Sequence, residues 1–486
     1  MPLRRPNLLL LGLLLSCGPM AARRGATVLY ASGADLQSIN PLFTVHPLAR
    51  QVQRYVLLTT LLRYDSSMTV EPALARRWVW SDAGKRLTLT LSSALRWHDG
   101  VATTSRDAAW TLERARDPRT GYPRQNDLGT LRQITATDDT TLTLDFTVPP
   151  GRVPDVLTDL AILPAHLLDG VPIERLRSAA WNQHPVGNGP FRFVAHEPNR
   201  RWVFERNPDF PAELGGPPRL DRLVIAVVDE PMTKLAALTS GELDFAALQP
   251  AYASFARRDP TLVVRDYPVL FTTGIVFNAR RPPFNDPAAR RRVNVALDRR
   301  ALVEGFAYGF ATPAETPVPP ELVVPSAKFQ VPGGSVQAHL ELGTSNSELD
   351  SASLSFELLT VGSGEAALEQ MIQAQLARQG IRVTIRQLEL SAFLDRVYTA
   401  HQFEAAVLGT PGDLGLGYLD PLARLSGLPV PSTATPAGLL DFFRDSLPVA
   451  FLYHARGVQG INRRLEGVQL GLRGELATVS RWSVRP

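Results

Sequence analysis

One loop places a carboxylate where ligands bind in many proteins. The loop runs through Thr410, Pro411, Gly412 and Asp413 and follows an apolar strand expected at 405–408. Ligands of open α/β sheets bind at the ends of strands. A carboxylate buried there could pair with a cationic group through charge-assisted hydrogen bonds of about 1.5–3 kcal/mol each. The alternative is a solvent-exposed turn residue, because Asp often hydrogen-bonds within its own turn.

A second candidate for chemistry is the tripeptide His98-Asp99-Gly100, since imidazole and carboxylate are common metal ligands and general bases. The tripeptide lies where an alternating strand ends, and Asp-Gly is a strong turn signal. We therefore interpret it as a structural turn. The eight histidines include no pair at metal-ligand spacing on one helix. We expect neither a metal site nor another cofactor.

Arginines are concentrated in one predicted helix at 286–305, and a phosphate-binding patch is one interpretation. On that helix Val293, Leu297 and Ala301 form an apolar stripe, and the arginines project mostly elsewhere. A solvated helix face is the better explanation. The arginines are Arg290, Arg291, Arg292, Arg299 and Arg300.

Covalent catalysis finds no support in the sequence. The chain has no Gly-x-Ser-x-Gly elbow and no zinc motif, and its only cysteine is Cys17. We expect no enzyme, and a periplasmic enzyme is the least favoured alternative.

The formal charge of +4 comes from 51 basic and 47 acidic residues spread along the chain. Nucleic acid is therefore not an expected partner.

The N-terminal residues have the pattern of an export signal. Arg4 and Arg5 precede an apolar run at 8–15, which is too short to span a bilayer but suits a secretory signal. The run ends in Leu14-Leu15-Ser16-Cys17, which resembles a bacterial lipobox. That resemblance implies that residues 1–17 are a lipoprotein signal, with cleavage before Cys17 and acylation of its thiol. A buried N-terminal helix is the alternative.

The length of 486 residues predicts two or three domains, and a hydrophobic content of 44% with 20% charged residues is typical of a soluble globular protein. Alternating apolar residues predict strands at 27–31, 87–91 and 141–146. Thr104 and Asp107 resemble a capping box that opens a helix ending near Arg116.

Later segments predict a hairpin and then a parallel sheet. Aromatic residues alternate at 191–204 on both sides of Glu197-Pro198-Asn199, which indicates a hairpin with one aromatic face. Helices are expected at 52–62 and 231–238. A strand at 354–359, a helix at 365–379 and a strand at 381–388 form a β-α-β unit.

The chain resembles a known family at many places in the correct order. It is similar to the extracytoplasmic solute-binding proteins of family 5, the dipeptide-, oligopeptide- and nickel-binding proteins of ABC importers. One such motif is weak, but the ordered set is specific and covers roughly residues 27 to 425. The matching motifs are Asn40-Pro41-Leu42, Glu71-Pro72-Ala73-Leu74-Ala75, Trp97-His98-Asp99-Gly100, Ile162-Leu163-Pro164-Ala165-His166, Gly187-Asn188-Gly189-Pro190-Phe191, Glu205-Arg206-Asn207-Pro208-Asp209-Phe210, Gly241-Glu242-Leu243-Asp244 and Ala296-Leu297-Asp298-Arg299.

The resemblance implies a bilobal α/β fold of the periplasmic-binding-protein type (type II, cluster C) with three domains. The first lobe would be discontinuous, and the second would be 266–457. A domain at 47–174 would be inserted into the first lobe. The first lobe would consist of 18–46, 175–265 and 458–486.

The resemblance also implies where a ligand binds. In peptide-binding members an acidic residue in the loop that matches 410–415 takes the ligand's α-ammonium group, and here that residue is Asp413. Gly412 and Thr410 would accompany it, although many relatives carry tryptophan at the position of Thr410. Leu36, Gln37 and Ser38 match another ligand-facing segment.

The function that follows is an extracytoplasmic, lipid-anchored receptor that binds peptides between its lobes and delivers them to the permease subunits of an ABC importer. It would act as a monomer in the periplasm or on the outer face of the cytoplasmic membrane. A receptor for a metal chelate, an opine or a sugar is the alternative in the same fold. The segments 321–350 and 426–446 are shorter than the corresponding segments of most family members. A helix expected in 426–446 is mostly missing.

Overall fold

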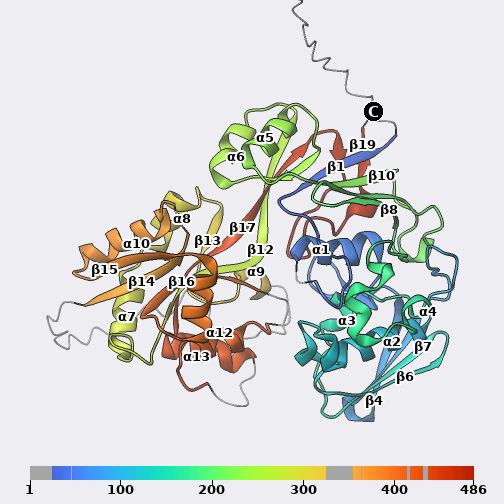
Figure 1. Ribbon diagram of the computed structural model, residues 1–486, viewed down its shortest axis with the longest axis horizontal. Helices are drawn as coiled ribbons and strands as arrows, with labels where there is room; N and C mark the ends of the chain where they lie inside the picture. The colour runs from blue at the N-terminus through green and yellow to red at the C-terminus, as the bar shows by residue number, and fades with distance from the viewer. Residues whose placement is uncertain are drawn as a thin grey trace, which may run out of the picture.

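The chain forms two lobes, which are joined at the top of Figure 1 by two long strands. The computed structural model describes residues 25–44, 46–323, 354–362, 364–412, 416–430 and 436–485. The connecting strands are β12 (Leu262–Phe277) and β17 (Val449–Asn462). We call the mass that contains both ends of the described chain the first lobe and the other mass the second lobe. The architecture agrees with the predicted bilobal α/β fold.

One sheet continues from the first lobe into the second, because β12 and β17 belong to both. Its parallel pairs are those of β1 with β10 and β11, and of β14 with β15 and β16. In sheet order the strands are β15 (Arg382–Leu388), β14 (Ser355–Val361), β16 (Ala405–Pro411), β12, β17, β11 (Phe245–Ala247), β1 (Thr27–Ser32), β10 (Arg222–Val227), β9 (Arg201–Arg206) and β8 (Phe191–Glu197), with β13 (Ala311–Pro313) beside β17.

The segment 47–174 adds a four-stranded antiparallel sheet below the first lobe (Figure 1). Leu87, Leu89 and Leu91 are buried on its inner face, as their alternation predicts. The capping box of Thr104 and Asp107 is confirmed, and it opens a helix that ends at Arg116. The elements here are β2 (Leu62–Tyr64), β3 (Val70–Pro72), β4 (Ala75–Ser81), β5 (Arg86–Leu91), α2 (Ser105–Arg116), β6 (Leu131–Asp138), β7 (Thr141–Phe146), α3 (Val156–Asp159) and α4 (Ala165–Leu168).

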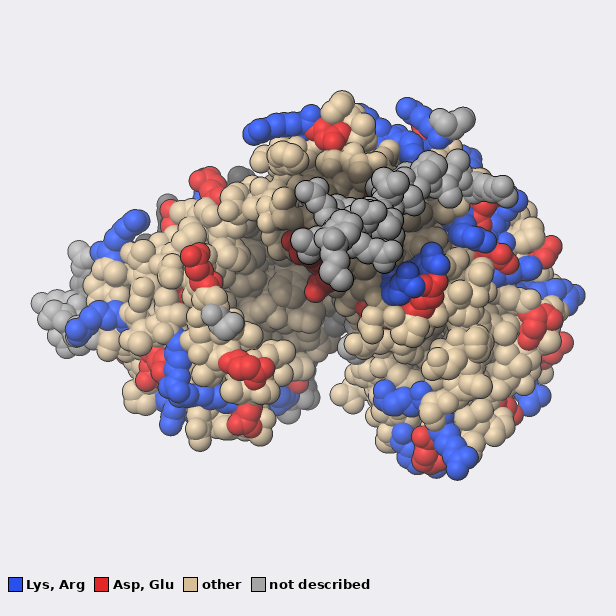
Figure 2. Space-filling view, turned by 45° about the horizontal axis from the view of Figure 1, so that its top comes forward, with Lys and Arg blue, Asp and Glu red and all other residues tan. Residues whose placement is uncertain are grey.

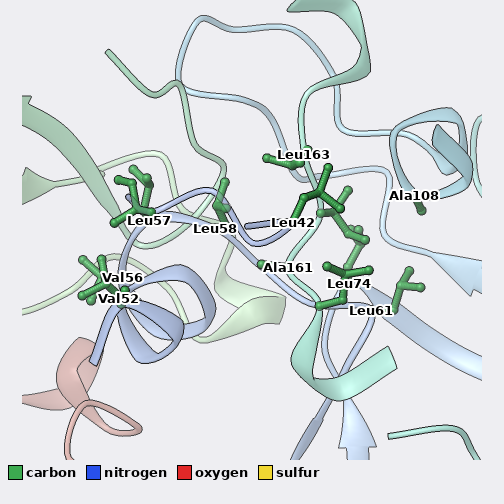
Figure 3. Close-up of a cluster of buried hydrophobic side chains, with 14 of the residues drawn as sticks. Leu42, Val52, Val56, Leu57, Leu58, Leu61, Leu74, Ala108, Ala161 and Leu163 are labelled. Carbon is green, nitrogen blue, oxygen red and sulfur yellow. The ribbon is translucent and has the colours of Figure 1, made fainter. Parts of the chain in front are cut away.

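A single apolar core joins this segment to the rest of the first lobe. Figure 3 shows Leu42, from the loop after β1, near Leu163 and Leu74 of the segment 47–174. Val52 and Val56 lie in the same cluster and come from α1 (Pro47–Val52) and the π-helical turn η1 (Gln53–Leu57). Burial of about 25 cal/mol per Å² of apolar surface therefore holds both parts together.

The second lobe packs helices on both faces of its part of the sheet, over two separate apolar clusters. Its helices are α7 (Pro287–Ala296), α8 (Arg299–Phe306), α9 (Pro320–Val323), α10 (Ala367–Arg378), α11 (Leu390–Leu394), η9 (Asp395–Thr399), α12 (Leu419–Leu425) and α13 (Pro436–Ser446).

Short elements complete the first lobe. They are the helices α5 (Pro231–Thr239) and α6 (Pro250–Ala256), the 3-10 turns η2 (Asp82–Gly84), η3 (Pro118–Thr120), η4 (Gln125–Leu128), η5 (Ile173–Ser178), η6 (Ala180–Asn182), η7 (Ala212–Leu214) and η10 (Val479–Arg481), and the strands β18 (Leu465–Glu466) and β19 (Ser483–Val484). Among the described residues, no helix combines the length and apolarity needed to cross a bilayer.

Three predictions about helices differ from the structure. The helix expected at 286–305 is two helices, because Asp298 interrupts it and caps α8 through the amide of Ala301 at 3.0 Å. The helix expected at 52–62 is the pair α1 and η1, which begins and ends five residues earlier. A helix does occur within 426–446, since α13 occupies 436–446.

Candidate functional site

A hollow separates the two lobes in the space-filling view of Figure 2. Strands β12 and β17 pair antiparallel on the first-lobe side from Leu262 to Pro268 and again on the second-lobe side from Thr272. Between these stretches the register shifts, and residues 269–271 have no partner on β17. A ladder interrupted in this way bends more easily than a continuous one. We call this interruption the hinge, because it lies between the first-lobe and second-lobe stretches of the ladder.

The predicted loop 410–415 begins beside this hinge. Thr410 is still part of β16, half-buried and paired with Thr272, so the strand is longer than the sequence suggests. The amide of Gly412 donates to the carbonyl of Leu270 at 2.7 Å. A Cβ atom at Gly412 would lie 3.2 Å from both Leu270 Cβ and Tyr418 Cε1. Asp413 lies outside the described residues.

Polar groups support the loop from within the second lobe. Tyr418 donates its hydroxyl hydrogen to the carbonyl of Pro317 at 2.9 Å, and Thr272 Oγ1 lies 3.2 Å from the same carbonyl. Thr272 has one hydroxyl hydrogen, and it goes to this carbonyl, which can only accept. His454 Nδ1, 2.9 Å from Thr272 Oγ1, must therefore be the donor in that contact. Burial lowers the pKa of His454 to about 4, so its ring is neutral at pH 7.

The other predicted segment, Leu36 to Ser38, belongs to the first lobe. Leu36 is fully buried in the apolar core, whereas Gln37 is exposed with a φ of 60°. Ser38 is half-buried, and its Oγ accepts from the amide of Asn40 at 3.1 Å. The structure therefore places the described residues of the two predicted segments on different lobes. Leu36 to Ser38 follow β1 in the first lobe, and Thr410 to Gly412 lie at the end of β16 in the second.

Asp35 fixes this first-lobe segment to the β8–β9 hairpin. Its carboxylate accepts hydrogen bonds from Trp202 Nε1 at 2.8 Å and from the amide of Asn199 at 2.6 Å, and it lies 3.0 Å from His196 Nε2. Burial raises the pKa of Asp35, but these hydrogen bonds outweigh it and lower the pKa to about 2. The charged carboxylate thus organises the backbone that precedes Gln37.

A polar cluster at the first-lobe side of the hinge was not predicted. Glu475 accepts from Tyr267 on β12 at 2.5 Å, from Gln459 on β17 at 3.2 Å, and from Gln51. All three donors are neutral. Because Glu475 and Tyr267 lie far apart in sequence, no local pattern could have indicated their contact.

Further contacts link the hinge strands to both lobes. Arg456 on β17 pairs with Asp266 on β12 at 2.6 Å and with Glu321 of α9 at 3.1 Å. Met68 and Leu472 of the first lobe pack against an apolar cluster of the second lobe. The lobes are thus connected at the hinge and at these two side chains.

The His98-Asp99-Gly100 tripeptide forms the predicted turn, with Gly100 at a φ of 92°. Burial lowers the pKa of His98 to about 4, and its Nε2 lies 3.0 Å from the carbonyl of Gly189. His166 Nε2 lies 2.8 Å from Asp99. In the described part of the chain, no group of three His, Cys, Asp or Glu side chains could hold a metal ion.

Comparison with known proteins gives one family. Residues 69–426 match the family described as bacterial extracellular solute-binding proteins, family 5 Middle. A putative ABC transporter peptide-binding protein of Brucella ovis is 27% identical over 357 residues, which cover 72% of this chain and 67% of that protein.

Solved structures show the same fold. The oligopeptide-binding protein AppA of Bacillus subtilis in complex with a nonapeptide has a TM-score of 0.72 and 20% identity, covering 95% of this chain and 99% of AppA. NikZ of Campylobacter jejuni in complex with Ni(L-His) has a TM-score of 0.71 and 20% identity, covering 94% of this chain and 99% of NikZ.

Proposed function

The chain belongs to family 5 of the bacterial extracellular solute-binding proteins, and from that membership we propose that it captures a peptide in the hollow between its lobes. The family resemblance predicted from the sequence motifs is confirmed. The protein is the substrate-binding component of an ABC transporter, a receptor and not an enzyme.

Family membership carries the proposal, and the interrupted ladder between β12 and β17 beside the hollow supports closure of the lobes. A ligand that contacts both lobes binds the closed arrangement more tightly than the open one, and binding shifts the population without covalent chemistry. The permease subunits of the importer would recognise the closed form. Contacts to both lobes require groups from each, which the segments 36–38 and 410–413 could supply.

In this proposal Asp413 takes the α-ammonium group of the peptide, flanked by Gly412 and Thr410. A hydrogen bond to a charged group is worth about 1.5–3 kcal/mol, which would favour ligands with a free amino terminus. The close packing of Gly412 against Leu270 and Tyr418 supports this assignment, because it ties the start of the loop to the hinge. Gln37 and Ser38 are the accessible candidates in the first lobe, with Leu36 beneath them.

The proposal includes export and a lipid anchor at Cys17. Cys17 lies outside the described residues, and the basis is the lipobox-like sequence Leu14-Leu15-Ser16-Cys17. Two or more acyl chains are needed for stable anchoring. Mass spectrometry of the N-terminal peptide from the native host tests this: a lipid-modified Cys17 is expected, and an unprocessed N-terminus contradicts it.

Ligand class is tested by thermal shift of the purified receptor against a panel of peptides, nickel chelates, opines and sugars. A ligand present at one hundred times its Kd stabilises the native state by about 2.7 kcal/mol, which is readily measured. We expect stabilisation by peptides only. Stabilisation by a chelate, an opine or a sugar, without any peptide response, would replace the peptide proposal with the other ligand class in the same fold.

A further inference from the structure

Three guanidinium groups of the first lobe converge on one buried carboxylate. Asp159, at the end of α3, pairs with Arg54 at 2.5 Å, with Arg124 at 2.9 Å, and with Arg50. Burial raises the pKa of Asp159, but the three positive charges hold it well below its usual range. Arg124 also pairs with Asp127 at 2.5 Å. The cluster therefore concentrates guanidinium groups around one buried carboxylate.

A small open pocket lies beside this cluster, between the loop after β1 and the segment 47–174. Arg50 and Arg124 line it, together with the side chains of Thr44, Gln53 and Tyr122. Asp159 is the one acidic residue in the lining, and the arginines already neutralise it. The pocket therefore presents cationic and neutral polar groups, and its one carboxylate is already paired.

Gln53 is the group in this pocket that lacks a partner. Its side chain is 2% exposed, and its amide nitrogen has no hydrogen-bond partner among the described residues. Buried donors of this kind are normally satisfied by an ordered water or an ion.

We propose that this pocket binds a small oxyanion, a carboxylate or phosphate group, held by Arg50, Arg124 and the amide of Gln53. The planar guanidinium fork matches the geometry of these oxyanions and carries the opposite charge. For a free ion the inference does not rest on the proposed function, because the lining belongs to the first lobe alone. For an acidic group of the captured ligand it does rest on that function.

The oxyanion has two sources, a free ion or an acidic group of the captured ligand. Calorimetric titration of the mature receptor with phosphate and with acetate, at constant ionic strength in chloride, tests the free ion. Comparing the affinity of a peptide with a free C-terminal carboxylate and the affinity of its C-terminal amide tests whether the ligand supplies the oxyanion.

We expect either binding of phosphate or acetate, or tighter binding of the peptide acid than of its amide. In Arg50→Gln the affinity in the experiment that responds should fall at least tenfold. Arg119→Gln, an exposed arginine paired with Asp117, is the matched control and should change nothing. If phosphate and acetate fail to bind, and the peptide acid and amide bind alike, the proposal is overturned. If the unaltered protein binds phosphate but binds no peptide, the proposed peptide function is overturned and the proposed oxyanion site is not.

Because Arg50→Gln also breaks an ion pair, Gln53 supplies a second test. Gln53→Glu places a carboxylate where the oxyanion should bind, so it should raise the Tm without added anion and abolish the response to phosphate or to the acidic ligand group. Gln53→Met keeps the size but removes the donor, and should lower the affinity severalfold. A lower Tm in Gln53→Glu, with anion binding unchanged, would contradict the proposal.

Discussion

Tyr267 on β12 donates its hydroxyl hydrogen to Glu475 at 2.5 Å, and the two residues are 208 positions apart in the sequence. Burial, and then the charge of Glu475, raise the pKa of Tyr267 well above its usual range, so the hydroxyl remains a donor. Gln459 on β17 donates to the same carboxylate. The C-terminal segment is therefore fastened to both strands that connect the lobes.

Tyr267→Phe removes this hydrogen bond and leaves the half-buried Glu475 with one donor fewer. We expect a loss of about 1–3 kcal/mol in the free energy of unfolding, measured by urea denaturation. Tyr252→Phe is the matched control, since Tyr252 is half-buried without a hydrogen bond from its hydroxyl to the described residues. Equal stability of the two variants would show that the contact with Glu475 contributes nothing.

Asp413→Asn should weaken peptide binding by roughly tenfold or more, because about 1.4 kcal/mol corresponds to a factor of ten. The physical reason is the loss of a carboxylate opposite the α-ammonium group. Calorimetry with a peptide and with its N-acetylated form measures this directly. The acetylated peptide should bind both proteins alike, and Asp395→Asn, an exposed residue of the second lobe, should behave as the unaltered protein. Unchanged affinity would remove Asp413 from the site.

Local patterns predicted many single elements well. The alternation at 141–146 predicted both bounds of β7, and Thr104 with Asp107 predicted the start of α2. Both signals depend on neighbouring residues alone. The hairpin of β8 and β9 followed from aromatic alternation around a turn. Such signals persist in the fold because tertiary contacts reinforce them.

Elements that depend on distant residues were missed. The helix predicted through Asp298 ends there because the side chain of Gln375, on α10, bonds both the amide and the carbonyl of Asp298. Strand β12 passes from one lobe to the other and its burial pattern changes on the way, so no single alternation marks its full length. For the same reason, the sequence indicated neither the Glu475 cluster nor the arginines around Asp159.

His454 should make stability fall in mild acid. Its pKa is lowered from 6.5 to about 4 in the folded protein, so between these values the unfolded chain binds a proton that the folded one does not. Stability is then complete above pH 6.5 and declines towards pH 4, by at most about 1.4 kcal/mol per pH unit. His454→Gln should reduce this slope in denaturation at several pH values. The exposed His184→Gln should leave it unchanged, and an equal effect of both variants would contradict the assignment.

Gly187→Ala should destabilise the first lobe. A Cβ atom there would lie 2.0 Å from the carbonyl oxygen of Leu57, which is backbone and cannot move aside. Overpacking costs about 1–3 kcal/mol or more, and a lower Tm is the expected result. At Gly170 a Cβ atom would meet nothing within 4 Å, so Gly170→Ala is the control. A Gly187→Ala variant as stable as the control would show that η1 can shift.

The proposed receptor function depends most on closure of the lobes around a ligand. Small-angle X-ray scattering of the receptor, titrated with a peptide that stabilises it in the thermal-shift panel, measures that closure directly. We predict a radius of gyration that falls with occupancy and saturates at the same peptide concentration as binding. An unchanged radius of gyration at full occupancy would contradict the account.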